Sequence, residues 1–155
     1  MSNDTAGIPV PPPLVFLGAL VVGLVLDAVA PLGWPWPSTW PVVVAAIVLF
    51  CLGLAIIRWQ FVTFRQVGTP VPTRLPTKAL ATGGPYRFSR NPGYGAIAFL
   101  YTALTLTFGG WWSILALIPT ILLIRYAVIS REERYLERKF GEEYRAYKAR
   151  VRRWI

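Results

Sequence analysis

Two groups of polar side chains in the second half of the chain are the candidates for chemistry. The first follows Tyr86, where arginine, asparagine and tyrosine alternate with glycine and proline as far as Gly95. The second begins at the adjacent carboxylates Glu132 and Glu133 and continues with further arginines and tyrosines. Guanidinium groups bind carboxylates, carboxylates bind ammonium groups or ribose hydroxyls, and aromatic faces bind rings or onium cations.

The sequence contains no histidine and a single cysteine, Cys51. The lack of histidine removes the usual near-neutral general base and the commonest metal ligand. One cysteine forms neither an intrachain disulfide nor a cysteine-based zinc site. We therefore predict no metal site, and any chemistry must depend on carboxylates, tyrosine, arginine, amides or a cofactor.

The composition is that of a membrane protein. Of 155 residues, 55% are hydrophobic and 15% charged, and the mean hydropathy is +0.50, which is too apolar for an ordinary soluble domain. The net charge of +9 would suggest nucleic acid in a soluble protein, but all sixteen Lys and Arg lie within residues 58–90 and 125–153. Such loop asymmetry is typical of membrane proteins. We expect membrane lipid, and not nucleic acid, as the partner.

Apolar runs predict four transmembrane helices in two hairpins. Residues 14–30 and 42–57 are the arms of the first hairpin, 14–62, which turns at a segment rich in proline and tryptophan, 31–41. Residues 93–124 carry no charge, and one straight helix of that length would reach roughly 48 Å, beyond a hydrocarbon core of about 30 Å. The second hairpin, 93–129, therefore turns at Gly109 and Gly110. Asp27, the one charge in the first run, is either an interfacial group or a functional acid.

The sequence thus predicts one all-α integral membrane domain, residues 1–155. A proline-rich lead-in (1–13) precedes the first hairpin, a loop (63–92) joins the hairpins, and a charged segment (130–155) follows the second. Four crossings place both termini and the loop on one side, which also holds both basic stretches. The positive-inside rule makes that side the cytoplasm, so we predict insertion in the cytoplasmic membrane with both termini cytoplasmic.

Residues 130–155 are predicted to form a cytoplasmic amphipathic helix. Apolar side chains recur there at spacings of three and four, as on one helix face: Leu136, Phe140, Tyr144, Tyr147 and Val151. The helix and the loop meet at the same membrane boundary, which brings their polar groups within reach of each other. This set matches the groups of S-adenosylmethionine, and it equally suits a salt-bridged collar at a membrane boundary.

Sequence motifs in the loop and in the tail point to a more specific function. They are Gly84-Pro85-Tyr86-Arg87, Arg90-Asn91-Pro92-Gly93-Tyr94-Gly95, Glu132-Glu133, and Phe140-Gly141-Glu142-Glu143-Tyr144-Arg145-Ala146-Tyr147. In order and spacing they resemble those of the isoprenylcysteine carboxyl methyltransferases and the related phospholipid methyltransferases, small membrane enzymes that use S-adenosylmethionine. The resemblance covers about residues 70–155. Asn91 stands where the family typically has histidine, and an amide forms hydrogen bonds but does not titrate.

The resemblance implies a site for S-adenosylmethionine between the loop and the tail. The residues implied to bind the cofactor are Tyr86, Arg87, Asn91, Tyr94, Gly95, Glu133, Arg145 and Tyr147. The residues implied to be catalytic are Glu132, Glu133 and Arg90, although Arg90 is also suited to stabilising the loop. Arg145 and Tyr147 would complete the pocket near the amino-acid end of the cofactor.

Methyl transfer from a sulfonium requires an in-line nucleophile, a water-poor pocket and orientation more than strong acid or base catalysis. We predict methyl transfer to a lipophilic acceptor at the cytoplasmic membrane face, with an isoprenylcysteine-type carboxylate, already ionised at pH 7, as the leading acceptor. A phospholipid amine is the alternative, and it would need Glu132 or Glu133 as a base. The alternative of another class is a non-catalytic membrane subunit or a degenerate relative. The oligomeric state stays open.

Overall fold

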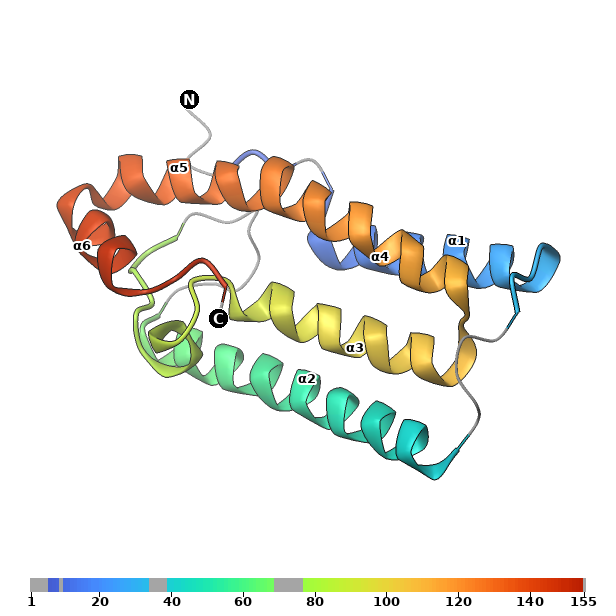
Figure 1. Cartoon of the computed structure of the whole chain (residues 1–155). Coiled ribbons are helices and arrows are strands. Elements are labelled where there is room, and N and C mark those ends of the chain that lie inside the picture. Colours follow the sequence, from blue (N-terminus) through green and yellow to red (C-terminus); the bar gives the residue numbers. More distant parts are fainter. Residues whose placement is uncertain (1–5, 9, 34–38, 69–76, 155) are drawn as a thin grey trace.

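The computed structural model describes residues 6–8, 10–33, 39–68 and 77–154. Throughout these residues the regular secondary structure is helical (Figure 1), in agreement with the predicted all-α fold. The centre of the predicted first turn, and parts of the lead-in and of the loop, lie outside the described residues. The elements are α1 (Pro12–Val29), α2 (Trp40–Gln66), the 3-10 turn η1 (Gly84–Arg87), α3 (Pro92–Phe108), α4 (Trp111–Leu123), the π-helical segment η2 (Ile124–Ile129), α5 (Ser130–Phe140) and α6 (Glu142–Arg150).

Three helical stretches of the described chain are long and apolar enough to cross a membrane. They are Pro12–Val29, Trp40–Gln66 and Trp111–Phe140. The predicted count of four is therefore not reached. The predicted span that does not qualify is α3, which has 17 residues. A helix of that size is about 25 Å long, shorter than a hydrocarbon core of about 30 Å.

The apolar helices do not pair as the two predicted hairpins. Instead, α1 packs mainly on α4 and α2 packs mainly on α3 (Figure 1). Glycine allows close contact within each pair of helices. Between α1 and α4, a Cβ on Gly23 would lie 2.6 Å from the Cα of Ser113. Between α2 and α3, a Cβ on Gly53 would lie 2.9 Å from the carbonyl oxygen of Ala96. An apolar cluster connects α1, α3 and the α4–η2 helix. Its buried members are Ile8, Phe16, Leu20, Tyr101, Ile124, Val128 and Ile129.

The last apolar helix continues directly into the charged tail. Residues Trp111–Phe140 form one long helix, with η2 at the transition from apolar to charged sequence. The tail beyond it is not a single helix, contrary to the prediction, because Gly141 adopts φ +51° and ψ −121° and separates α5 from α6. Glycine has access to this left-handed backbone at low cost. After α6, residues 151–154 leave the helix; we term them the C-terminal strap.

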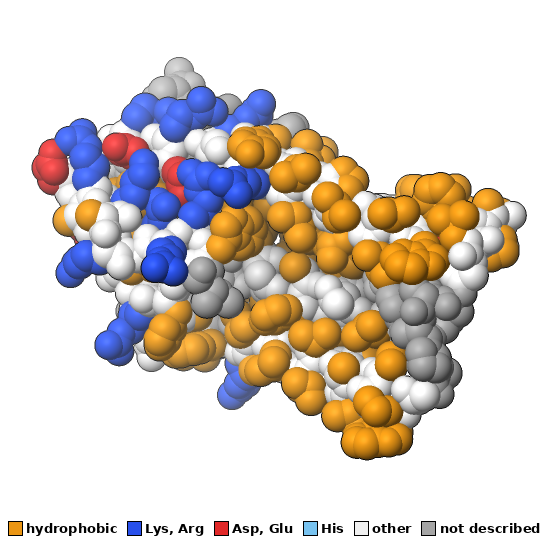
Figure 2. Space-filling model, viewed as in Figure 1, with side chains coloured by type: hydrophobic (Ala, Val, Ile, Leu, Met, Phe, Trp, Pro, Cys, Tyr) orange, Lys and Arg blue, Asp and Glu red, His pale blue; other side chains and the backbone are white. Residues whose placement is uncertain are grey.

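The surface divides along the long axis of the molecule. Hydrophobic side chains cover the shafts of the apolar helices, whereas Lys and Arg gather at the end that holds α5 and α6 (Figure 2). The exposed hydrophobic residues of α1 include Leu14, Val21 and Val25. Because large exposed apolar surfaces are rare in soluble monomers, this division fits a helix bundle in lipid with one charged end in water.

Asp27 connects α1 to the start of α4. Its carboxylate accepts hydrogen bonds from the backbone N–H groups of Gly110 (2.7 Å), Trp112 (2.9 Å) and Ser113 (3.1 Å), and from Ser113 Oγ (2.6 Å). The first N–H groups of a helix have no partner within the helix. Asp27 therefore caps α4 from a neighbouring helix, and it does so at the end of the bundle far from α5 and α6.

We predict that Asp27→Ala destabilises the protein by about 1–3 kcal/mol, because several N–H donors lose their acceptor. Thermal unfolding of the detergent-solubilised protein measures the effect. Asp27→Asn is the matched control; it keeps one carbonyl oxygen as acceptor, and we expect an intermediate loss. An unchanged Tm in Asp27→Ala would show that the cap does not hold α1 to α4.

Candidate active site

Two glycines place the first motif against the end of α2. Gly84 has φ +56°, and a Cβ there would overlap the Oγ1 of Thr63. At Gly93, in the first turn of α3, a Cβ would overlap the Oε1 of Gln60. Between them the Tyr86 ring packs on Phe64, with 5.3 Å between ring centroids. Close backbone approach thus fixes η1 and the start of α3 on α2.

Glu133 lies between two arginines. Its Oε1 is 3.0 Å from Nη1 of Arg90 and 3.1 Å from Nε of Arg153, and its Oε2 is 2.5 Å from Nη2 of Arg153. The side chains of Glu133 and Arg90 are only 8% and 11% exposed. The hydrogen bond to Glu133 raises the pKa of Arg153, which keeps that guanidinium charged. Two guanidinium groups around one carboxylate leave one positive charge uncompensated.

The C-terminal strap holds the first motif through its backbone. The N–H of Arg90 donates to the carbonyl of Arg152 (2.9 Å), and the carbonyl of Arg153 accepts from Asn91 Nδ2 (2.9 Å) and Ser89 Oγ (3.2 Å). In turn, Ser89 Oγ accepts from the N–H of Asn91 at 3.1 Å. The side-chain amide of Asn91, predicted to bind the cofactor, is therefore engaged by the strap.

Tyr94 and Glu132 form a separate polar pair between α3 and α5. Tyr94 Oη donates to Glu132 Oε1 at 2.7 Å, and both side chains are half-buried. In the part of the chain that the structure describes, no Lys or Arg lies within ion-pair distance of Glu132. The two adjacent glutamates thus differ: Glu133 pairs with two arginines, whereas Glu132 accepts a hydrogen bond from a phenol.

Three tyrosines close the site from η1 and α6. Tyr147 Oη donates to the carbonyl of Tyr86 at 2.8 Å, and the rings of Tyr144 and Tyr147 lie 6.1 Å apart. Burial raises the pKa of Tyr86 and of Tyr147. Burial, together with the charge of Glu133, raises the pKa of Tyr144 to about 12. All three phenols are therefore neutral at physiological pH and remain hydrogen-bond donors.

Two of the predicted cofactor-binding residues lie outside this cluster. Arg87 is exposed. Arg145 is also exposed, and its guanidinium pairs with Glu142 and, at 3.5 Å, with Glu137. The break at Gly141 explains this position, since it turns α6 so that Tyr144 and Tyr147 face inward and Arg145 faces outward.

Sequence reasoning missed four residues at this end of the molecule, and the structure places three of them beside a predicted one. They are Ser89, Tyr144, Arg153 and Trp154, the last of which packs against the apolar cluster. The helical spacing included Tyr144 but gave it no role. The other three carry no signal of their own, because their partners are distant in sequence.

The site offers donors and space for a ligand. Nε and Nη1 of Arg90 are buried and make no hydrogen bond, although Nη1 lies beside Glu133. A Cβ on Gly95 would meet no atom within 4 Å. By contrast, the described residues include no group of three or more Asp, Glu or Cys that could hold a metal ion.

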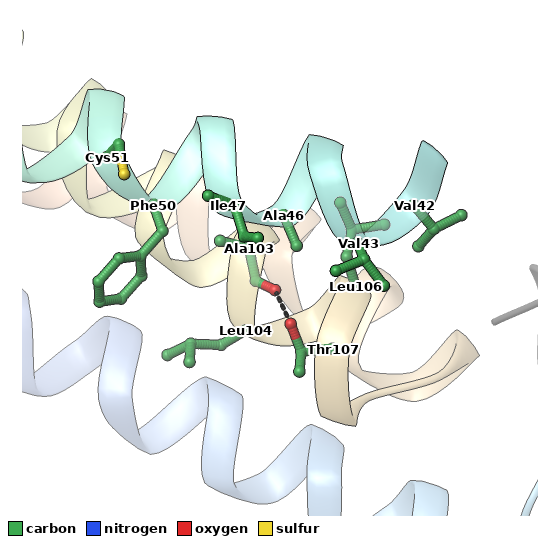
Figure 3. A pocket seen from close by; sticks show the side chains of 10 residues that line it. All are labelled: Val42, Val43, Ala46, Ile47, Phe50, Cys51, Ala103, Leu104, Leu106 and Thr107. Atoms are coloured by element: carbon green, nitrogen blue, oxygen red, sulfur yellow. Dashed lines mark hydrogen bonds between the residues drawn. The ribbon is translucent and has the colours of Figure 1, made fainter. Parts of the chain in front are cut away.

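A cavity with a volume of about 330 Å³ lies elsewhere, between α2 and α3 (Figure 3). Nine of its ten lining residues are apolar or the thiol Cys51, and the hydroxyl of the tenth, Thr107, donates to the carbonyl of Ala103 at 2.9 Å. No free polar group in its lining could orient a reacting atom. The lining of the cavity is therefore suited to an apolar group.

Comparison with known proteins identifies the family. The model of the family described as phospholipid methyltransferase matches residues 41–143, from α2 to the start of α6. A Haemophilus influenzae protein described as uncharacterized is 47% identical over 62 residues, which make up 40% of this chain and 98% of that protein. No solved structure matches. Because the family model covers more than half of the chain, and includes Tyr94, Glu132 and Glu133, the protein belongs to the phospholipid methyltransferase family.

Proposed function

We propose that the protein transfers a methyl group from S-adenosylmethionine to a lipophilic acceptor at the cytoplasmic membrane face. The observation that carries the proposal is the pair of Tyr94 Oη and Glu132 Oε1, 2.7 Å apart, at the charged end of an apolar helix bundle. Membership of the family supports methyl transfer in general. The position of the pair supports an acceptor whose apolar part lies in the bilayer.

The groups around the pair fit the chemistry of the cofactor. The one excess positive charge of the cluster formed by Arg90, Arg153 and Glu133 suits the cofactor's carboxylate. A Cβ on Gly95 would meet open space, and the face of the neighbouring Tyr94 ring suits an onium cation. When bound, S-adenosylmethionine supplies an electrophilic methyl group. The chain itself has to orient the acceptor, exclude water and manage any proton.

Glu132 favours an amine over a carboxylate as the acceptor. It has no cationic partner in the described chain, so it attracts an ammonium group and repels a carboxylate. Glu132 would take the proton of the ammonium, and the nitrogen lone pair would then form the new N–C bond as the S–C bond breaks and its electrons return to sulfur. Tyr94, by donating to Glu132 Oε1, fixes the carboxylate for this step.

We further propose that α3 is a fourth, short crossing. Its length of about 25 Å requires tilt or local thinning of the bilayer, both of which cost little. Four crossings place both termini and the basic residues on the cytoplasmic side, as the positive-inside rule demands. The Tyr94–Glu132 pair then faces the cytoplasm, from which a water-soluble cofactor enters.

Binding of the demethylated cofactor tests the site directly. We expect calorimetry to show saturable binding of S-adenosylhomocysteine to the detergent-purified protein, and we expect Tyr94→Ala to weaken that binding about tenfold, or 1.4 kcal/mol. Arg145→Ala is the control, because Arg145 is exposed and paired with glutamates; its affinity should stay within about twofold of the parent. A folded parent protein that binds no S-adenosylhomocysteine would refute the proposed cofactor site and favour a non-catalytic protein.

The topology has its own test. In a Cys51→Ser background, a cysteine at Phe108, which is 67% exposed at the end of α3, should react with a membrane-impermeant maleimide added outside spheroplasts. A cysteine at Thr82, which is exposed in the loop before α3, should react only after permeabilisation. Reaction of both cysteines from the same side would exclude the fourth crossing.

A further inference from the structure

The C-terminal strap lies across the candidate active site. Beyond α6 the chain turns back and runs toward the start of α3 (Figure 1). Two anchors hold it there: its carbonyls accept the three hydrogen bonds from Arg90, Ser89 and Asn91, and the guanidinium of Arg153 binds Glu133. The strap is therefore held in a fixed position on the rest of the fold.

Trp154 extends from these anchors into apolar surroundings. It follows Arg153 directly, so the bonds at Arg153 fix where its indole lies. The half-buried ring packs against the cluster that connects α1, α3 and η2, and the Tyr94 ring packs against the same cluster. The indole and the Tyr94 ring are therefore joined through one apolar cluster.

We propose that Trp154 is a specificity-determining residue that restricts the approach of lipid chains from the bilayer to Tyr94 and Glu132. A lipophilic acceptor cannot reach this pair through water, so its chain has to enter between helices. A rigid bicyclic side chain on that path excludes bulky chains and packs against those that fit. The proposal deepens the proposed function, since it concerns access of the acceptor to the same pair.

Photolabelling tests the restriction without requiring turnover. The probe is a phosphatidylethanolamine with a diazirine in one acyl chain, incorporated into nanodiscs with the full-length protein. Trypsin releases α1 and most of α2 as one peptide, residues 1–58, and α3 with α4 as another, residues 91–125, because neither contains an internal Lys or Arg. Peptide 1–58 presents lipid-facing α1 and α2 and serves as the internal reference. The exposed Leu115, Ile118 and Leu122 of α4 also face lipid in peptide 91–125. The readout is therefore the labelling of residues 92–98 within that peptide, located by fragment sequencing, relative to peptide 1–58.

We expect Trp154→Ala to raise this labelling ratio about tenfold. One changed contact in an apolar pocket alters the discrimination between ligands by about tenfold or more. Trp154→Phe, which keeps an aromatic ring, should stay near the parent. Trp154→Leu replaces Trp154→Ala if the alanine variant does not fold, since it retains apolar packing and loses the bicyclic bulk. An unchanged ratio in a folded variant would overturn the proposal.

Titration with S-adenosylhomocysteine separates the two proposals. If Trp154 restricts only the acceptor, its variants bind S-adenosylhomocysteine with the affinity of the parent. Loss of that affinity together with an unchanged labelling ratio would make the strap a purely structural clamp and would overturn the role in specificity. A parent that binds no S-adenosylhomocysteine, but whose ratio rises in Trp154→Ala, would remove the proposed function and leave a lipid gate.

Discussion

The site depends on one carboxylate, Glu133, held by two guanidinium groups. Arg90 comes from the loop before α3 and Arg153 from the C-terminal strap, so the ion cluster ties both segments to α5. Burying these charges is expensive, and removing the carboxylate would leave two arginines in mutual repulsion. The cluster therefore assembles only when all three segments are in place. It also leaves one net positive charge at the charged end of the bundle, which favours the binding of an anionic group.

The membrane bundle supplies the fixed frame for this cluster. At one end Asp27 caps α4 from α1, and at the other the same long helix continues through η2 into α5, which carries both glutamates. Tight glycine contacts join α2 to α3 and α1 to α4. Glu132 and Glu133 are thus positioned by a continuous helix rather than by a flexible tail. A π-helical segment at that transition is consistent with a functional site, where such segments are frequent.

Much of this arrangement was predictable from sequence, and the remainder was not for identifiable physical reasons. Hydropathy and charge asymmetry predicted the helical membrane class, and the motifs predicted the family. Periodicity failed at Gly141, because one glycine at positive φ redirects α6 while the apolar spacing continues unchanged. Asp27 gave no signal of its role, since its partners are backbone N–H groups more than eighty residues away. The same holds for Arg153: nothing in the local sequence shows that it binds Glu133.

The central claim is that Glu132 serves a methyl transfer to a lipid amine. The most direct measurement supplies purified protein in nanodiscs with methyl-labelled S-adenosylmethionine and phosphatidylethanolamine, and identifies the labelled lipid by mass spectrometry. The account predicts label on the amine nitrogen, reduced about 10²–10⁴-fold in Glu132→Gln, while that variant still binds S-adenosylhomocysteine. Transfer at the parental rate by Glu132→Gln, or a lipid amine that stays unlabelled by the parent protein, would contradict it.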